Sequence, residues 1–296
     1  MNLQIHTSRI RRIGLAAAAV LGMTTSQALE LNKGDHVVLI GNALAERMQH
    51  HGWLESYAQA AMPDKELVFR NHGFGGDKVN NRPRNSGFPS ADAYLEISKA
   101  DVILAFWGYN ESFDNSPDAY RADLTKWIDE TNGKKYNDKG APTIVLFSPI
   151  AHENLGQANL PDGSANNERL AKYAEVTRQV ANEKGVEFVD LFHLSQDLYE
   201  RSKLPLTING IHLTSKGNNQ LARGIHKSLF GKSPRASGRK LARIRDAVLD
   251  KNWHWYNRYR ATDGNDVWGG RSGLRFVAGQ TNREVLQQEL KMIDVM

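Results

Sequence analysis

The apolar positions of this chain fall into two alternating patterns. The first pattern consists of short runs rich in β-branched, aromatic and leucine side chains, at residues 36–42, 67–73, 101–110, 143–151 and 187–192. In the second pattern, which lies between these runs, apolar residues recur at helical spacing, as they do from Tyr120 to Ile128 and from Leu170 to Val180. Continuous apolar strands that alternate with helices predict βαβ units and a parallel sheet covered on both faces.

We therefore expect an α/β fold, a three-layer α/β/α sandwich around a five-stranded parallel sheet. In such a sheet the ligand lies outside the carboxyl ends of the strands. The segments after the first four runs are dense in polar and Gly residues, and they are residues 42–47, 72–78, 110–114 and 148–154. We expect the functional site among these loops.

From about residue 231 the pattern changes. A hinge-like segment at 231–240 precedes a basic, aromatic-rich helix at 241–260, a Gly-rich stretch at 263–273 and an amphipathic helix at 281–295. We interpret residues 231–296 as a helical extension packed on the main domain of residues 29–230, because so short a segment buries little core by itself. Trp255 and Tyr259 are spaced as a packing face, although aromatic residues near a polar opening also suit a carbohydrate groove.

The N-terminus resembles an export signal. Arg9, Arg11 and Arg12 precede an apolar core at residues 13–23, which is followed by the small-residue cleavage pattern ending at Ala28. About 11 apolar residues are too few to span a bilayer, which needs roughly 20. We expect residues 1–28 to be a signal peptide cleaved near Ala28 and the bacterial protein to be secreted or periplasmic; an N-terminal membrane anchor is the alternative.

Charge and cysteine content exclude several classes of function. The 296-residue chain has 38 Lys and Arg against 33 Asp and Glu, a net charge of +5. Loss of the three leader arginines leaves a net charge near +2, so no overall field favours nucleic acid, and no second long apolar run predicts stable membrane insertion. With no Cys there are no disulfides and no thiolate ligands. No tight H-x-H or H-E-x-x-H spacing is present, and we expect no metal and no cofactor.

Four short segments resemble the conserved blocks of the SGNH or GDSL hydrolase superfamily, in the same order. They are Gly41-Asn42-Ala43-Leu44, residues 71–77 (NHGFGGD), Gly108-Tyr109-Asn110-Glu111 and Asn209-Gly210-Ile211-His212. The resemblance covers roughly residues 34–230 and implies a flavodoxin-like SGNH fold, a Ser-His-Asp triad and three oxyanion donors. A secreted branch of planctomycete, verrucomicrobial and related bacteria has segments that resemble residues 44–55 (LAERMQHHGWLE), 73–84 (GFGGDKVNNRPR), 108–113 (GYNESF) and 148–154 (SPIAHEN).

Two positions depart from the family pattern. Ala43 stands where Gly-Asp-Ser-Leu has its nucleophilic serine, so no acyl-enzyme can form there. Asn209 stands where the triad has its acid; an amide can hold the His212 ring but can select the wrong tautomer. The resemblance still implies that the N–H groups of Ala43 and Gly76 and the Asn110 amide converge on one oxygen, with His212 as general base on a water.

Further polar residues in the same loops are candidates for substrate binding, namely Asn42, Arg47, Asp77, Glu111, His152 and Glu153. Two carboxylates that face each other across a sugar would run glycosidic acid–base chemistry, and Glu111 is the first candidate because it follows Asn110. Each carboxylate also suits a salt bridge or a helix end. Arg47, Arg82 and Arg84 suit an anionic ligand, or pair locally.

The resemblance and its departures together favour a hydrolase of esters, such as acetylated carbohydrate, that acts by a non-standard mechanism without a serine. Two alternatives stay open. One is a non-catalytic pseudoenzyme that binds a glycan or a carboxylate. The other is a glycosidase or lyase that uses the loop carboxylates. In each case the expected partner is an extracellular small molecule or polysaccharide.

Overall fold

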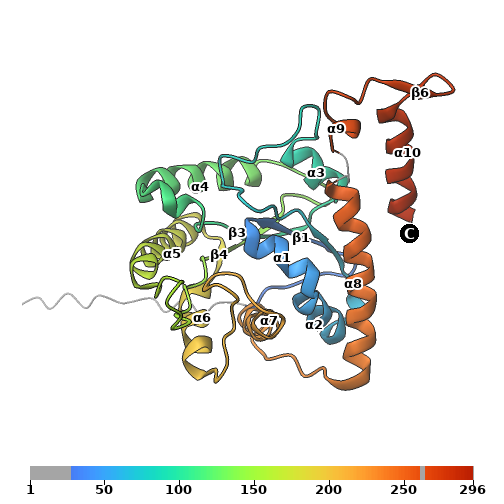
Figure 1. Ribbon diagram of the computed structural model, residues 1–296. Coiled ribbons are helices and arrows are strands. Elements are labelled where there is room, and N and C mark those ends of the chain that lie inside the picture. Colours follow the sequence, from blue (N-terminus) through green and yellow to red (C-terminus); the bar gives the residue numbers. More distant parts are fainter. Residues whose placement is uncertain (1–27, 261–263, 296) are drawn as a thin grey trace, which may run out of the picture.

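The computed structural model describes residues 28–260 and 264–295 (Figure 1). The predicted signal peptide lies outside the described residues except for Ala28. No helix within the described ranges combines the length and the hydropathy needed to cross a membrane.

The main sheet has five parallel strands in the order β2-β1-β3-β4-β5. They are β1 (His36–Gly41), β2 (Val68–Asn71), β3 (Val102–Phe106), β4 (Thr143–Phe147) and β5 (Glu187–Val189). The five apolar runs are thereby confirmed as strands, and the predicted α/β fold class is confirmed. The chain leaves β1 in one direction toward β2 and later pairs β3 on the other side, so the topological switch point lies between β1 and β3.

Helices cover both faces of the sheet, as Figure 1 shows. Side chains of β1 alternate between the two cores: Val37 and Leu39 face one, and Val38 and Ile40 face the other. The first core is closed by α1 (Ala43–His51), α2 (Trp53–Ala61) and α7 (Ser215–Phe230). The second is closed by α3 (Ala91–Ile97), α4 (Pro117–Asn132) and α5 (Ser164–Lys184). Helix α6 (Leu191–Arg201) follows β5, and one-turn 3-10 helices lie at Pro63–Lys65 and Glu111–Asp114.

The C-terminal segment begins with the long helix α8 (Gly238–Arg260), which runs beside α1 and α2 (Figure 1). The indole N–H of Trp255 donates to the Asn71 carbonyl over 2.8 Å, and the Asn252 amide donates to Gln49 over 3.0 Å. Trp255 and Tyr259 are buried, which confirms the predicted packing face, whereas Trp253 is exposed. The segment continues through α9 (Gly264–Val267), the hairpin strands β6 (Arg275–Val277) and β7 (Gln280–Thr281), and α10 (Asn282–Val295).

The junction of β1 and α1 places the site. Gly41 has φ 133° and passes so close to β3 that a Cβ there would overlap the Phe106 carbonyl oxygen, so only glycine fits. Asn42 then caps α1, since its side-chain oxygen accepts the Leu44 N–H over 3.2 Å. Helix α1 therefore begins at Ala43, beside the carboxyl ends of β1 and β3.

Candidate functional site

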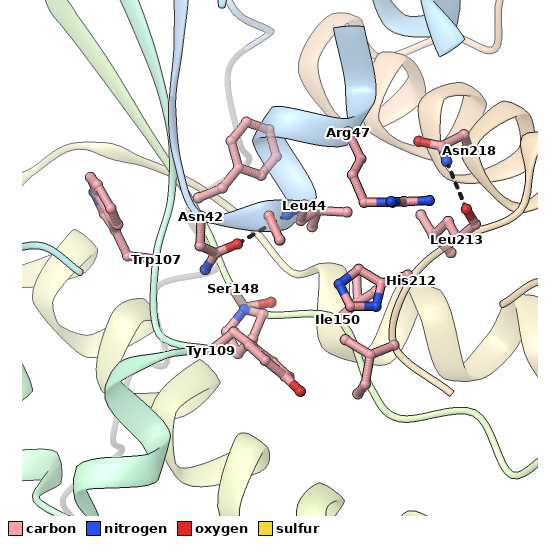
Figure 2. Close-up of a pocket in the computed structure, with 14 residues that line it drawn as sticks. Asn42, Leu44, Arg47, Trp107, Tyr109, Ser148, Ile150, His212, Leu213 and Asn218 are labelled. Carbon is pink, nitrogen blue, oxygen red and sulfur yellow. Dashed lines mark hydrogen bonds between the residues drawn. The ribbon is translucent and has the colours of Figure 1, made fainter. Parts of the chain in front are cut away.

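A small cavity opens at the N-terminus of α1. Ala43 and Arg47 of α1, Tyr109 after β3 and His212 before α7 contribute to its wall. Figure 2 shows the side chains of Arg47, Tyr109 and His212 around it. Its volume is about 30 Å³. The remaining lining is mainly apolar and includes Phe106, Ile150, Ile211 and Leu213. We call this space the α1 cavity.

Ala43 and Arg47 make one side of the α1 cavity positive. They are one helical turn apart and so lie on the same face of α1. As the first helical residue, Ala43 has an N–H with no partner inside the helix, at the positive end of the helix dipole. The Nε of Arg47 is buried without a hydrogen-bond partner, and among the described residues this arginine forms no ion pair. This side of the cavity is suited to an anion or a developing negative charge.

His212 is half-buried in the same cavity and is held by Asn209. Its Nδ1 lies 3.2 Å from Oδ1 and 3.1 Å from Nδ2 of Asn209, while that same oxygen accepts the His212 backbone N–H over 2.9 Å. Burial lowers the pKa of His212, and the charge of Arg47 lowers it further, against a smaller opposing effect of Glu46. The imidazole is therefore neutral at pH 7, the form that a general base requires.

Gly76 and Asn110 are not among the residues that line the α1 cavity, which differs from the predicted convergence of donors. The loop after β2 is drawn toward α1 by Glu46, whose carboxylate accepts the Gly75 N–H over 2.5 Å. The Asn110 amide donates instead to the carbonyl of Asp77 over 2.9 Å. A local hydrogen bond between the two loops thus uses the Asn110 amide, which the family resemblance assigns to oxyanion binding.

Two predicted substrate-binding carboxylates, Glu111 and Glu153, brace loops instead. Glu111 is 5% exposed, and its two oxygens accept the N–H groups of Val79 and Gly108, each over 2.9 Å. Burial raises the pKa of Glu111, and the two backbone donors oppose that rise. Glu153, also buried, accepts the N–H groups of Leu206 and Thr207. Neither lines the α1 cavity, and neither offers an unused carboxylate for sugar chemistry.

Asp77 and His152 are also placed outside the α1 cavity. Both oxygens of Asp77 are bound by Arg84, over 2.8 and 2.7 Å, so this carboxylate forms a local ion pair within its loop. His152 is buried with its ring against Gly163 and Gly210, where a Cβ would overlap it, and its Nδ1 contacts Asn166 over 2.9 Å. Its position makes it a packing residue of the loop after β4.

Ser148 lines the α1 cavity, but its hydroxyl is committed to helix α6. Its oxygen accepts the N–H groups of Leu191 and Phe192 over 2.8 and 3.0 Å, and it lies 3.5 Å from a carboxylate oxygen of Asp190. The residue is 1% exposed. These bonds tie β4 to the start of α6 and give no support to Ser148 as a displaced nucleophile.

Two predicted candidates, Asn42 and Arg47, do line the α1 cavity. Sequence reasoning did not select Tyr109, although it sits inside the Gly-x-Asn segment after β3. It also gave no sign of the apolar wall, because the positions of Ile150 and Leu213 depend on how separate loops pack. In the described part of the chain, no group of three or more His, Cys, Asp or Glu side chains could hold a metal ion.

The sequence matches the GDSL-like lipase/acylhydrolase family over residues 40–220. The chain belongs to this family. A search of curated proteins found no match.

Several solved structures have folds similar to that of this chain. An acetylxylan esterase from Geobacillus stearothermophilus is 18% identical with a TM-score of 0.54, over 71% of this chain and 100% of that chain. An α/β hydrolase enzyme from the metagenome of Lake Arreo in Spain is 18% identical with a TM-score of 0.52, over 67% and 96% of the two chains. A gut microbial diltiazem-metabolizing enzyme is 18% identical with a TM-score of 0.53, over 68% and 48%.

Replacement of Glu111 by Gln tests its role as a brace. A Gln side chain has one acceptor oxygen, so the N–H of Val79 or Gly108 loses its partner. We expect Glu111→Gln to lower the free energy of unfolding by about 1–3 kcal/mol in urea titrations. Whatever reaction the protein catalyses should keep its rate per folded molecule. A loss of turnover without a loss of stability would instead place Glu111 in the chemistry.

Proposed function

We propose that this chain is an ester hydrolase of acetylated carbohydrate in which a water molecule, activated by His212, takes the place of a serine nucleophile. The observation that carries the proposal is that His212, Arg47 and the first turn of α1 line one small cavity. Membership of the GDSL-like lipase/acylhydrolase family supports ester chemistry. The similarity to an acetylxylan esterase supports an acetylated sugar as the substrate.

Ala43 takes the place of the nucleophile in this proposal, and Asn209 takes the place of the triad acid. Catalytic mutants of the similar acetylxylan esterase replace a serine, an aspartate and a histidine. In this chain His212 takes the place of that histidine and keeps a side chain that can act as a general base. A methyl group forms no acyl-enzyme, but it leaves space beside the helix N-terminus where a water can stand.

The reaction then proceeds by direct attack of water. The Nδ1–H of His212 donates to Asn209, and Nε2 takes a proton from the water as its oxygen bonds to the ester carbon. Negative charge that develops on the carbonyl oxygen is stabilised by the Ala43 N–H and by Arg47. The tetrahedral intermediate expels the sugar oxygen, which takes the proton from the imidazolium, and acetate and a free hydroxyl result.

The size of the α1 cavity supports a small acyl group. A volume of about 30 Å³ is two to three times the ~10–15 Å³ needed to hold one water. An acetyl group fits such a space, whereas a long acyl chain does not. The apolar side chains of Phe106, Ile150 and Leu213 suit the acetyl methyl group, and the positive side suits its oxygen.

A second candidate function is capture of a carboxylate without turnover. The unpartnered Nε of Arg47, placed beside the start of α1, favours it, because an arginine fork and a helix N-terminus both bind carboxylates. This candidate shares the α1 cavity but needs no base. Cleavage of glycosidic bonds has less support, since Asp77, Glu111 and Glu153 all have their oxygens engaged.

We also propose that the protein works outside the cytoplasm. The basic, apolar and small-residue pattern of residues 1–28 supports export, and an acetylated polysaccharide is an extracellular substrate. We expect N-terminal sequencing of the protein from the culture medium or periplasm to find a new terminus near residue 29.

Removal of the base tests the mechanism. We expect wild-type protein to release acetate from acetylated xylo-oligosaccharides and to leave deacetylated ones intact, as product masses show. His212→Ala should lower kcat/KM by a factor of about 10² or more. His193→Ala is the matched control, since His193 is an exposed histidine on α6.

A gain of activity separates catalysis from a structural effect. A carboxylate at position 209 only accepts hydrogen bonds, so Asn209→Asp should fix the Nδ1–H tautomer and raise kcat by about tenfold or more. Saturable binding of acetate without release of acetate from any ester would refute hydrolysis and leave carboxylate capture.

The pH dependence tests the coupling between Arg47 and His212. Since the pKa of His212 is lowered below 6.5, kcat/KM should rise with pH below 6.5 and be level at neutral pH. Arg47→Gln removes a charge that lowers this pKa, so the acid limb should move to higher pH. Arg178→Gln, a surface change on α5, should leave the limb in place. An unmoved limb in Arg47→Gln would show that His212 is not the titrating base.

A further inference from the structure

A second cavity lies on the other side of Trp107, which lines both spaces. Its volume is about 250 Å³, far larger than that of the α1 cavity. The loop between β2 and α3 contributes Arg82, Arg84 and Phe88, and α8 adds Tyr259. We call it the Arg82 cavity. The family match ends at residue 220, so the wall from α8 comes from the C-terminal extension.

The Arg82 cavity carries an unbalanced positive charge. Arg84 is neutralised by Asp77, because it binds both oxygens of that carboxylate. Arg82 forms no ion pair among the described residues; one Nη donates to the Val79 carbonyl over 2.9 Å. Its guanidinium lies over the Trp107 ring, 5.3 Å from the centroid. A guanidinium has five N–H donors, so most of those on Arg82 are available to a ligand.

An unused donor lies in the same wall. Trp107 is 1% exposed, and its indole N–H is buried with no hydrogen-bond partner. Buried donors in native proteins are nearly always paired, so an unpaired one in a residue that lines a cavity points to a ligand acceptor. Trp107 and Arg82 come from different loops, those after β3 and β2, and both residues line this space.

The size and walls of the cavity select the ligand. A volume of about 250 Å³ exceeds by more than tenfold the ~10–15 Å³ that holds one water, so a bare ion would leave most of the space empty. Phe88, Trp107 and Tyr259 supply aromatic side chains to its wall, and the Trp107 ring lies against the Arg82 guanidinium. His72, which also lines the cavity, is neutral because burial lowers its pKa to about 3, and so adds no competing charge. Aromatic faces next to an arginine fork suit a ring that carries a carboxylate.

We propose that the Arg82 cavity is a second binding site, distinct from the α1 cavity, that takes a uronic acid unit of an acidic polysaccharide. The carboxylate accepts from Arg82 and a ring oxygen accepts the Trp107 indole N–H. The aromatic side chains cover the sugar faces. The site stands whether or not the α1 cavity hydrolyses esters, because none of its binding groups acts on a reacting bond.

Calorimetric titration with glucuronate tests the proposal. Wild-type protein should bind glucuronate saturably by about 10 mM, and glucose, the neutral analogue, should not bind. Arg82→Gln should weaken glucuronate at least tenfold, and Arg82→Lys, which keeps the charge but not the fork, should lie between. Arg201→Gln is the matched surface control, and Arg47→Gln, in the α1 cavity, should leave glucuronate binding unchanged.

A second variant tests the site independently if Arg82→Gln does not fold. Trp107→Phe keeps the ring but loses the N–H, and it should also weaken glucuronate while thermal unfolding confirms that it is folded. Equal affinity for inorganic sulfate and glucuronate would refute a uronic acid as the ligand and show that the site binds any oxyanion. Undiminished binding in folded Arg82→Gln, or no saturable binding to wild type, would overturn the site itself.

Discussion

The close passage of Gly41 against the carboxyl end of β3 is the constraint on which the site depends. Any side chain at residue 41 would collide with the Phe106 carbonyl. Because Gly41 has no side chain, the chain can turn from β1 into α1 here. Asn42 fixes the first turn by capping it. As a result the N-terminus of α1 stands at the topological switch point of the sheet, where open α/β sheets bind their ligands.

This placement sets the electrostatics of the α1 cavity. The helix end and Arg47 make one side positive, and the same arginine helps to keep His212 unprotonated. The Arg47 guanidinium has no carboxylate partner among the described residues, and its burial is costly until an oxygen with negative charge enters the cavity. In our proposal the cavity therefore keeps the base and the positive side of an ester hydrolase, while water supplies the nucleophilic oxygen.

The fold was predictable because it depends on a signal repeated along the chain. Five apolar runs, the first four of them followed by segments rich in polar and Gly residues, are enough to specify a parallel sheet and the edge at which its ligand binds. The individual roles of Asn110 and Glu111 were not predictable in the same way. Each depends on which of several nearby donors and acceptors it meets once two loops have packed, as when the Asn110 amide donates to the Asp77 carbonyl. Arg47 was predicted from sequence because it lies in the polar segment after the first apolar run and suits an anionic ligand.

The central claim is that the Ala43 N–H, Arg47 and His212 act on one bound group. Titration of isotope-labelled protein with acetate, the product of the proposed reaction, tests it most directly by nuclear magnetic resonance. We expect the Ala43 amide and the His212 ring resonances to shift together along one saturation curve, and both shifts to vanish in Arg47→Gln. Resonances that do not move, or that follow separate curves, would contradict it.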